Sequence, residues 1–503
     1  MVVKKTQPIL LVLLMLCLAI STVIVVTLLL PLVAAQASTQ TYSAAGILTL
    51  LLLIAVAILT ILRWEYGLFL TLASLSLVNR LKTVYFVDFG HVFITAETVF
   101  LFLLLIGWFF RNATQHRRER FKHYLVLPVF FFLAAGFLSL VNSADERVSV
   151  RLLVAGVVQP IILFYLITNN IRTRRQVKLV IYALIASAVV ATMYGLWQSL
   201  ATIVATGDMF DYRIVSVFYS PAIFAEILLL SIPLVVVTRL SLRNQKRTAG
   251  ILLDITFGGM IVALLLTLTR AAWLGLFVLL AILLVNKEMR SYLFRWVPVV
   301  LMFVLIQSAL VAELLTRRSY DLFAFNDSTT SVGERLFAWQ TAFVMMEDKP
   351  LGIGLGMFRR TWHTYQPNHA GMDAAHNLLL DTGVEMGLLG MIAFIWIAIH
   401  ALRINLRLYR SSADAYVSRL ALGVFSALGG YFGTPLAGGA ELAHNDMTIP
   451  GIPLGSPIST GMLVFWSLLA CLFILGESEK ASDELALRTI PRRRYVKHQF
   501  SNV

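Results

Sequence analysis

Long apolar runs separated by short polar connections recur along this chain from one end to the other. A helix needs about 20 predominantly apolar residues to cross a bilayer core of roughly 30 Å, and many of these runs have that length. The pattern therefore predicts about 12–14 membrane-spanning helices. The expected spans lie near residues 9–33, 44–62, 66–79, 92–110, 124–141, 152–168, 179–203, 217–238, 249–268, 271–286, 296–312, 377–401, 416–434 and 459–475.

Composition supports an all-α polytopic integral membrane protein. Hydrophobic residues make up 59% of the 503 residues and charged residues only 14%, whereas a soluble domain carries about 25% charged residues. We expect five segments. They are N-terminal transmembrane helices (1–179), central transmembrane helices (180–312), an outer loop with an amphipathic helix (313–375), C-terminal transmembrane helices (376–476) and a basic cytoplasmic tail (477–503).

The net charge of +14 is explained by membrane topology rather than by nucleic-acid binding. With the N-terminus inside, the cytoplasmic connections and the two termini contain 29 of the 41 lysines and arginines. This bias follows the positive-inside rule. It predicts a multi-pass protein of the cytoplasmic membrane with both termini in the cytoplasm and residues 313–375 on the outer side.

The outer loop is long for a connection between helices, and long loops are often functional. Leu336, Trp339, Phe343 and Met346 follow one another at helical intervals after a cap near 327–328, which predicts an amphipathic helix on the membrane surface or over a cavity. A lid packed only for stability is the alternative. The glycine-rich segment 350–358 predicts a tight loop or close backbone packing, because the strand of a phosphate-binding loop is not expected here.

Two outer arginines lie next to membrane spans. Arg213 precedes the span at 217–238, and Arg270 separates two apolar runs. An arginine so close to hydrocarbon is costly unless it lines a polar cavity and has a partner. The alternatives are a side chain that extends to the interface or an ion pair with a carboxylate. Because a guanidinium forms paired hydrogen bonds with phosphate oxygens, the two arginines are candidates for binding a diphosphate.

The sequence HNLLLDTGVEMGLLG, where the outer loop re-enters the membrane, has the spacing H-N-x9-G-x-x-G. His376 can accept a proton near neutral pH and is the candidate general base; an ordinary helix-entry histidine is the alternative. Asn377 is expected to orient a sugar or cap the helix. Asp381 and Glu385 share one helix face, so one of them is expected to be protonated or paired with an arginine. The supporting glycines are Gly387 and Gly390, at which a neighbouring helix could approach closely.

This spacing resembles the signature of the O-antigen ligase and polymerase superfamily. In that family an outer arginine, a second arginine that opens a helix and a histidine after a large outer loop follow one another, and Arg213, Arg270 and His376 match in that order. The resemblance covers about residues 180–435 and departs at Ser216, where the family has glycine, and at Ala222, where it has asparagine. It implies a GT-C-like architecture and glycan transfer from a polyprenyl diphosphate, expected to be undecaprenyl diphosphate.

The acceptor implied by the resemblance is a glycolipid such as lipid A-core, or another glycan. Arg335 is a candidate for the acceptor face. We expect metal-independent chemistry without a cofactor, since neither an outer D-x-D nor a compact zinc pattern occurs in the sequence. A polymerase and a protein O-glycan transferase remain alternatives within the superfamily. A transporter with charges along its substrate path is the alternative from another class.

Overall fold

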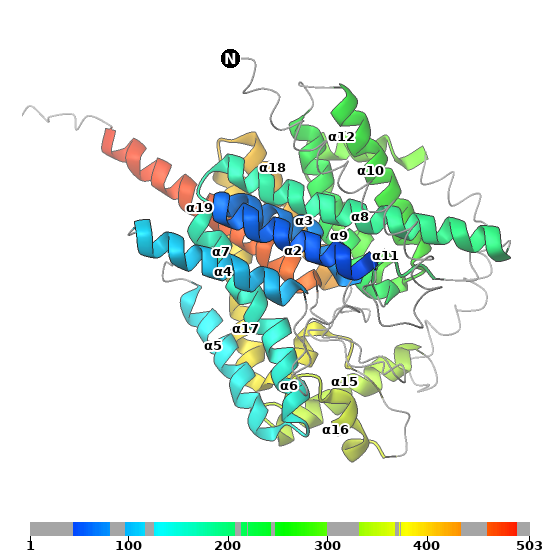
Figure 1. The fold of residues 1–503 in the computed structure, drawn as a ribbon. Coiled ribbons are helices and arrows are strands. Elements are labelled where there is room, and N and C mark those ends of the chain that lie inside the picture. The colour runs from blue at the N-terminus through cyan, green and yellow to red at the C-terminus, as the bar shows by residue number, and fades with distance from the viewer. Residues whose placement is uncertain are drawn as a thin grey trace, which may run out of the picture.

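The structure is a computed structural model. It describes residues 44–80, 96–115, 125–206, 213–218, 220–242, 247–298, 331–367, 372, 374–433 and 460–489. Every regular element within these ranges is a helix (Figure 1), which confirms the all-α prediction. The helices are α2 (Ala44–Leu62), α3 (Trp64–Arg80), α4 (Ala96–Gln115), α5 (Val126–Leu138), α6 (Glu146–Leu153), α7 (Gln159–Asn170), α8 (Arg174–Thr206), α9 (Pro221–Ser241), α10 (Arg247–Leu266), α11 (Arg270–Leu283), α12 (Lys287–Phe294), α15 (Ser331–Asp348), α16 (Phe358–Tyr365), α17 (Leu378–Ser411), α18 (Ala415–Gly433) and α19 (Thr460–Thr489).

Each expected span within the described residues has a helix at its position. Six helical stretches are long and apolar enough to cross a membrane: Glu146–Asn170, Arg174–Thr206, Pro221–Ser241, Arg247–Leu266, Leu378–Ser411 and Thr460–Glu479. Three shorter apolar helices lie at Glu97–Phe109, Val126–Asn142 and Ala271–Leu283. The protein is therefore a polytopic membrane protein. The spans expected near 9–33 and 296–312 lie outside, or almost entirely outside, the described residues.

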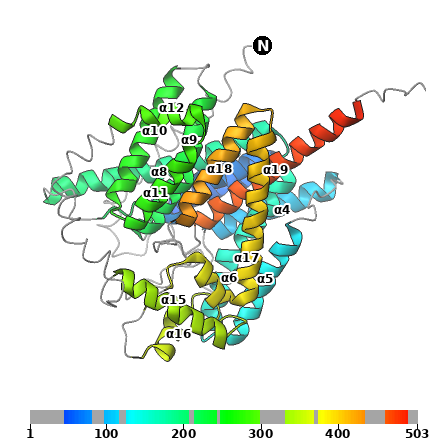
Figure 2. The ribbon, with the colours of Figure 1, turned by 180° about the vertical axis from the view of Figure 1, so that it is seen from behind.

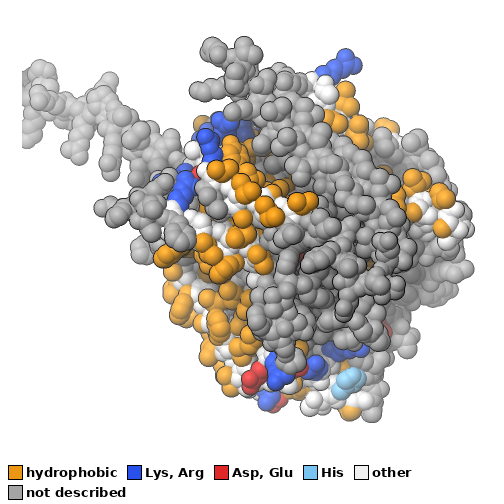
Figure 3. All heavy atoms as spheres, viewed as in Figure 1, with side chains coloured by type: hydrophobic (Ala, Val, Ile, Leu, Met, Phe, Trp, Pro, Cys, Tyr) orange, Lys and Arg blue, Asp and Glu red, His pale blue; other side chains and the backbone are white. Residues whose placement is uncertain are grey.

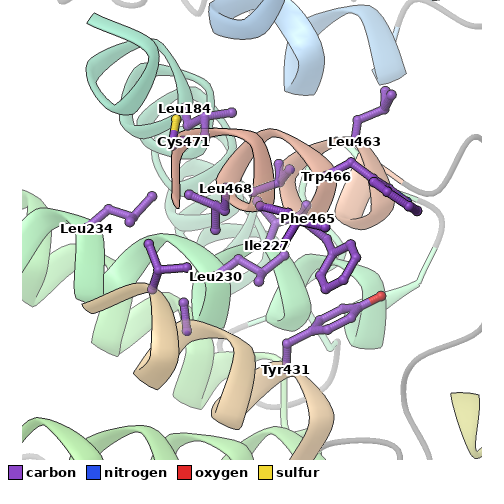
Figure 4. Close-up of a cluster of buried hydrophobic side chains, with 14 of the residues drawn as sticks. Leu184, Ile227, Leu230, Leu234, Tyr431, Leu463, Phe465, Trp466, Leu468 and Cys471 are labelled. Atoms are coloured by element: carbon purple, nitrogen blue, oxygen red, sulfur yellow. The ribbon is translucent and has the colours of Figure 1, made fainter. Parts of the chain in front are cut away.

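The main core forms around α9, which is buried along nearly its whole length. It packs against α8, α10, α11, α18 and α19. Figure 4 shows Ile227, Leu230 and Leu234 of α9 among side chains from α8, α18 and α19, including Tyr431 and Trp466. A helix that is apolar on all sides is expected to be surrounded in this way, because no face of it prefers water. This core holds the ends of α9, α10 and α11 in fixed positions.

A second, smaller hydrophobic cluster forms where α15 and α16 pack against the start of α17 (Figures 1 and 2). Its fully buried members include Ala342, Met345 and Trp362. The helix expected near residues 332–346 is present as α15, but its expected apolar stripe is divided. Met346 is buried, whereas Phe343 is 54% exposed. Small alanines face the protein because they allow α15 to approach α17 closely.

The surface over α4 and α5 is strongly apolar. Figure 3 shows apolar side chains gathered over these helices, with charged side chains at the lower end of the same view. Phe102 and Phe109 of α4 and Phe130 of α5 are all at least 60% exposed. Contiguous exposed aromatic side chains of this kind are unfavourable in water and favourable in lipid. This face is consistent with contact to the hydrocarbon core.

Candidate functional site

His376 lies two residues before α17 and adopts a backbone conformation that is rare for a residue with a Cβ. Its φ is +54°, in the left-handed region. Asn377 follows as the N-cap of α17, and its Oδ1 accepts hydrogen bonds from the backbone N–H groups of Leu379 (3.1 Å) and Leu380 (3.4 Å). The structure thus places Asn377 as a cap, one of its two expected roles. The imidazole of His376 is half-buried.

Asp381 holds the backbone on both sides of His376. Its Oδ1 accepts a hydrogen bond from the N–H of Ala375 at 2.7 Å, and its Oδ2 accepts one from the N–H of Asn377 at 3.0 Å. The carboxylate is only 2% exposed. The positive end of the α17 dipole and the two N–H donors stabilise a carboxylate at this buried position. In addition, the indole N–H of Trp339 on α15 donates to the carbonyl of Ala375 at 3.0 Å.

Gly387 interrupts α17. Its φ of 76° and ψ of 177° are not helical, so two helical stretches meet there at a kink. The segment that begins at Pro350 fills the break. The N–H of Ile353 donates to the carbonyl of Val384 at 3.0 Å, and the N–H of Leu388 donates to the carbonyl of Pro350 at 3.0 Å. The kink exposes backbone groups of α17, and the loop satisfies their hydrogen-bonding capacity.

The glycine-rich loop approaches α17 as backbone against backbone. Gly352, Gly354 and Gly356 all have positive φ. A Cβ on Gly352 would lie 2.6 Å from the carbonyl oxygen of Glu385, and one on Gly387 would lie 2.4 Å from the carbonyl oxygen of Pro350. The expectation of a tight, closely packed loop is confirmed. At Gly387 the approaching partner is this loop rather than the neighbouring helix that the sequence suggested.

The other side of the same loop is fastened to the turn before α6 and to α6 itself. Asn142 donates from its Nδ2 to the carbonyl of Gly352 at 3.0 Å, and Ser149 donates from its Oγ to the carbonyl of Leu355 at 2.8 Å. Asp145, the N-cap of α6, pairs with Arg360 of α16 at 2.6 Å. The N–H of Val148 contributes most to lowering the pKa of Asp145, and Arg360 lowers it further.

The side chain of Arg213 binds the turn that directly precedes Arg270. Its Nε donates to the carbonyl of Thr267 at 3.0 Å, and its Nη2 donates to the Oγ1 of Thr269 at 3.0 Å. Thr269 is the N-cap of α11 and Arg270 is the first residue of that helix. The side chain of Arg213 therefore lies at the helix N-terminus where Arg270 is the first residue. Such a terminus attracts anions, because its N–H groups and dipole point outward.

Ser216 occupies the position where the resembling family has glycine. Its φ is +57°, a conformation that glycine adopts without steric cost. Its Oγ donates to the carbonyl of Ala191 at 2.5 Å, and its N–H donates to the Oε1 of Gln198 at 2.9 Å. These contacts hold a serine in a conformation that suits glycine. Serine in place of the family's glycine therefore does not prevent the left-handed backbone conformation at residue 216.

The remaining candidates lie around the start of α17. Glu385 is 4% exposed, and its carbonyl accepts the N–H of Gly354 at 3.1 Å. Arg335 is half-buried on α15. Gly390 faces α5, since a Cβ there would lie 3.5 Å from the Cβ of Ala135. The expectation that Asp381 or Glu385 is protonated or paired with an arginine stays a prediction; the structure adds that the carboxylate of Asp381 accepts two backbone N–H groups.

The structure brings these candidates into two groups. Arg213 binds the α10–α11 turn, after which Arg270 begins α11, whereas His376, Asn377 and Asp381 lie where α15 packs on α17. In Figures 1 and 2, α12 lies at one end of the molecule and α15 and α16 lie at the other. The α10–α11 turn is at the end of α11 opposite α12, so it points toward the α15–α16 end. Convergence of the imidazole with both guanidinium groups in one pocket stays a prediction.

Three contacts in these groups were not anticipated from the sequence. They are the Trp339 hydrogen bond, the paired acceptance by Asp381 and the binding of Arg213 to Thr267 and Thr269. The threonine before the apolar run of α11 is an N-cap signal that could have indicated the last of these. Within the described part of the chain, no cluster of three or more His, Cys, Asp or Glu side chains could hold a metal ion.

Together, the helical architecture and these polar segments define a polytopic membrane protein with two groups of candidate residues. Residues 255–395 match the sequence model of the family described as O-Antigen ligase. This match supports the assignment of the chain to the O-antigen ligase-like superfamily. The matched segment includes Arg270, α15, His376 and the Gly387 break, but not Arg213. A comparison with curated proteins finds no match.

Proposed function

We propose that this protein is a membrane glycosyltransferase that moves a glycan from undecaprenyl diphosphate to a hydroxyl acceptor, with lipid A-core or a similar glycolipid as the acceptor. The observation that carries the proposal is the hydrogen bonding of Arg213 to the turn that begins α11 at Arg270. Two guanidinium-bearing residues at one helix N-terminus suit a group with several negative oxygens. A lipid diphosphate has this chemistry.

In the proposed reaction, the arginines bind the diphosphate and offset the charge that builds on it as it leaves. The acceptor oxygen attacks the anomeric carbon from the opposite side, and the bond between that carbon and the diphosphate oxygen breaks. His376 takes the proton of the acceptor hydroxyl on an imidazole nitrogen, as a general base. The products are the inverted glycoside and undecaprenyl diphosphate, and no metal ion takes part.

In the proposed topology, the donor enters the site from the outer leaflet of the cytoplasmic membrane. The excess of lysine and arginine in the cytoplasmic connections supports this orientation. It leaves α15, α16 and the start of α17 on the outer side. In this orientation the exposed apolar face over α4 and α5 lies in lipid. Both termini are then cytoplasmic.

The test uses the purified full-length protein in nanodiscs with an undecaprenyl diphosphate-linked glycan. Three acceptors are supplied separately: lipid A-core, a second donor molecule, and a peptide with serine and threonine hydroxyls. The products are identified by mass. Transfer to lipid A-core supports a ligase, extension of the second donor indicates a polymerase, and glycosylated peptide indicates a protein O-glycan transferase.

We expect His376→Ala, Arg213→Ala and Arg270→Ala each to lower transfer by about 100-fold or more, as losing a base or a charge-stabilising group does. Lys349→Ala is the control, because Lys349 is an exposed basic residue of the same outer segment as α15 and α16. Full transfer by both His376→Ala and Arg270→Ala would refute the mechanism. In a parallel experiment with the protein reconstituted in sealed vesicles, accumulation of substrate inside the vesicles without any glycan product would indicate a transporter.

A further inference from the structure

One side chain binds the backbone N–H groups of both residues that neighbour His376. The N–H before this residue and the N–H after it donate to different oxygens of Asp381, at 2.7 Å and 3.0 Å. Between these two anchors the backbone of His376 has a φ of +54°. Residues with a Cβ rarely adopt this conformation without support. The contacts therefore hold His376 in a conformation that it would otherwise leave.

A second side chain completes the arrangement from another helix. Trp339 of α15 donates its indole N–H to the carbonyl of Ala375 at 3.0 Å. Ala375, the residue before His376, is thus bound through its N–H by Asp381 of α17 and through its carbonyl by Trp339 of α15. Asn377 caps α17, so His376 is not needed as the cap. The two contacts around His376 therefore have another role than helix capping.

We propose that Asp381 is a positioning residue for His376, assisted by Trp339, and that it sets the direction in which the imidazole meets the acceptor hydroxyl. The inference rests on the proposed function, in which His376 is the general base. Asp381 does not touch the substrate in this proposal. Its carboxylate fixes the backbone on either side, and the backbone conformation fixes where the imidazole points.

The substitution that tests this is Asp381→Asn, which keeps the shape of the side chain. An amide offers one acceptor oxygen and one donor NH2 group, so it can satisfy only one of the two N–H groups. Thr382→Val is the matched control. Thr382 is the next residue of the same helix and is fully buried, and its hydroxyl donates to the carbonyl of Leu378 at 2.6 Å, away from His376.

In the transfer assay, Asp381→Asn should lower kcat by about 100-fold without changing KM, the size of effect that a shift of about 1 Å in a reacting group produces. Trp339→Phe should lower kcat by a smaller factor, and Thr382→Val should match the wild type. The decisive variant combines Asp381→Asn with His376→Ala. It should be no less active than His376→Ala alone, because no imidazole remains to be positioned.

Hydrogen–deuterium exchange provides a readout that does not depend on turnover. Asp381→Asn should speed exchange of the amides of Ala375 and Asn377, whereas Thr382→Val should not. Unchanged exchange or unchanged kcat in Asp381→Asn would overturn the inference. So would an equal further loss when Asp381→Asn is added to His376→Ala, because the effect would then be independent of the imidazole.

These outcomes separate the inference from the proposed function. If His376→Ala is inactive but Asp381→Asn is fully active, only the positioning role is wrong. If His376→Ala retains full transfer, or if the wild type transfers glycan to none of the three acceptors, the proposed function is wrong and the positioning role in catalysis is wrong with it.

Discussion

Gly387→Ala is expected to destabilise the protein strongly, because the break in α17 depends on this glycine. Its φ of 76° and ψ of 177° fall in a region that is essentially restricted to glycine. An added Cβ would lie 2.4 Å from the carbonyl oxygen of Pro350 and 2.5 Å from the carbonyl carbon of Leu351. Both contacts are with backbone atoms, so a side-chain rotation cannot relieve them.

The magnitude follows from two contributions. Forcing alanine into this conformation costs about 1–3 kcal/mol. Moving the loop away to make room breaks three backbone hydrogen bonds, which join Ile353 to Val384, Gly354 to Glu385 and Leu388 to Pro350. At about 1 kcal/mol each, they bring the expected loss in the free energy of unfolding to about 4–6 kcal/mol.

The assay is thermal unfolding of the purified protein in detergent, followed by intrinsic fluorescence at one fixed scan rate, since unfolding of large proteins is often irreversible. Gly259→Ala is the control. A Cβ at Gly259 of α10 would make only ordinary contacts of 3.6 Å with Leu196 and Thr192, and alanine favours a helix by about 1 kcal/mol over glycine. The reasoning is refuted if Gly387→Ala unfolds at the same temperature as Gly259→Ala or the wild type.

Three further predictions concern stability. Ser216→Gly should change the free energy of unfolding by less than about 1 kcal/mol, because relief of backbone strain at a φ of +57° offsets the lost hydroxyl hydrogen bond. Ser216→Val should cost about 2 kcal/mol, and equal unfolding temperatures for the two variants would contradict this. Met345→Ala, at a fully buried position of α15, should cost about 2–5 kcal/mol in the free energy of unfolding. Phe343→Ala, at a 54% exposed position, should cost less than about 0.5 kcal/mol in detergent, and equal losses for the two variants would contradict the buried position of Met345. Asp145→Asn should lower the unfolding temperature near neutral pH, because the folded-state pKa of Asp145 lies below the ordinary 3.8. The contribution of the ionised carboxylate to stability is therefore present above pH 3.8 and is lost as the pH falls through the folded-state pKa. A series of unfolding temperatures against pH checks this, and a difference from the wild type that persists at the lowest pH would contradict it.

The positions of the helices could be predicted from the sequence because hydropathy acts locally. An apolar run of sufficient length satisfies its own backbone hydrogen bonds as a helix in lipid, whatever its neighbours are. This is why α8, α9 and α10 lie where the apolar runs predict them. The same local reasoning indicated the helix at 331–348 and the close packing of the glycine-rich loop.

The packing directions could not be predicted in the same way. Periodicity placed Phe343 and Met346 on one stripe of α15, yet only Met346 is buried, together with Ala342 and Met345, and Phe343 is exposed. The apolar pattern identifies which side chains avoid water, but in a membrane protein lipid satisfies them as well as protein does. Only the shapes of the facing helices decide which of these side chains become buried.

The sequence by itself determined the class of protein, the order of its helices and the candidate functional residues, including Arg213, Arg270 and His376. Tertiary structure alone decided what these residues touch. Asp381 binds the backbone on both sides of His376, and Gly387 breaks α17 where a distant loop packs against it. The physical reason is that a hydrogen bond depends on distances of about 3 Å between groups, and the packing of whole helices sets those distances.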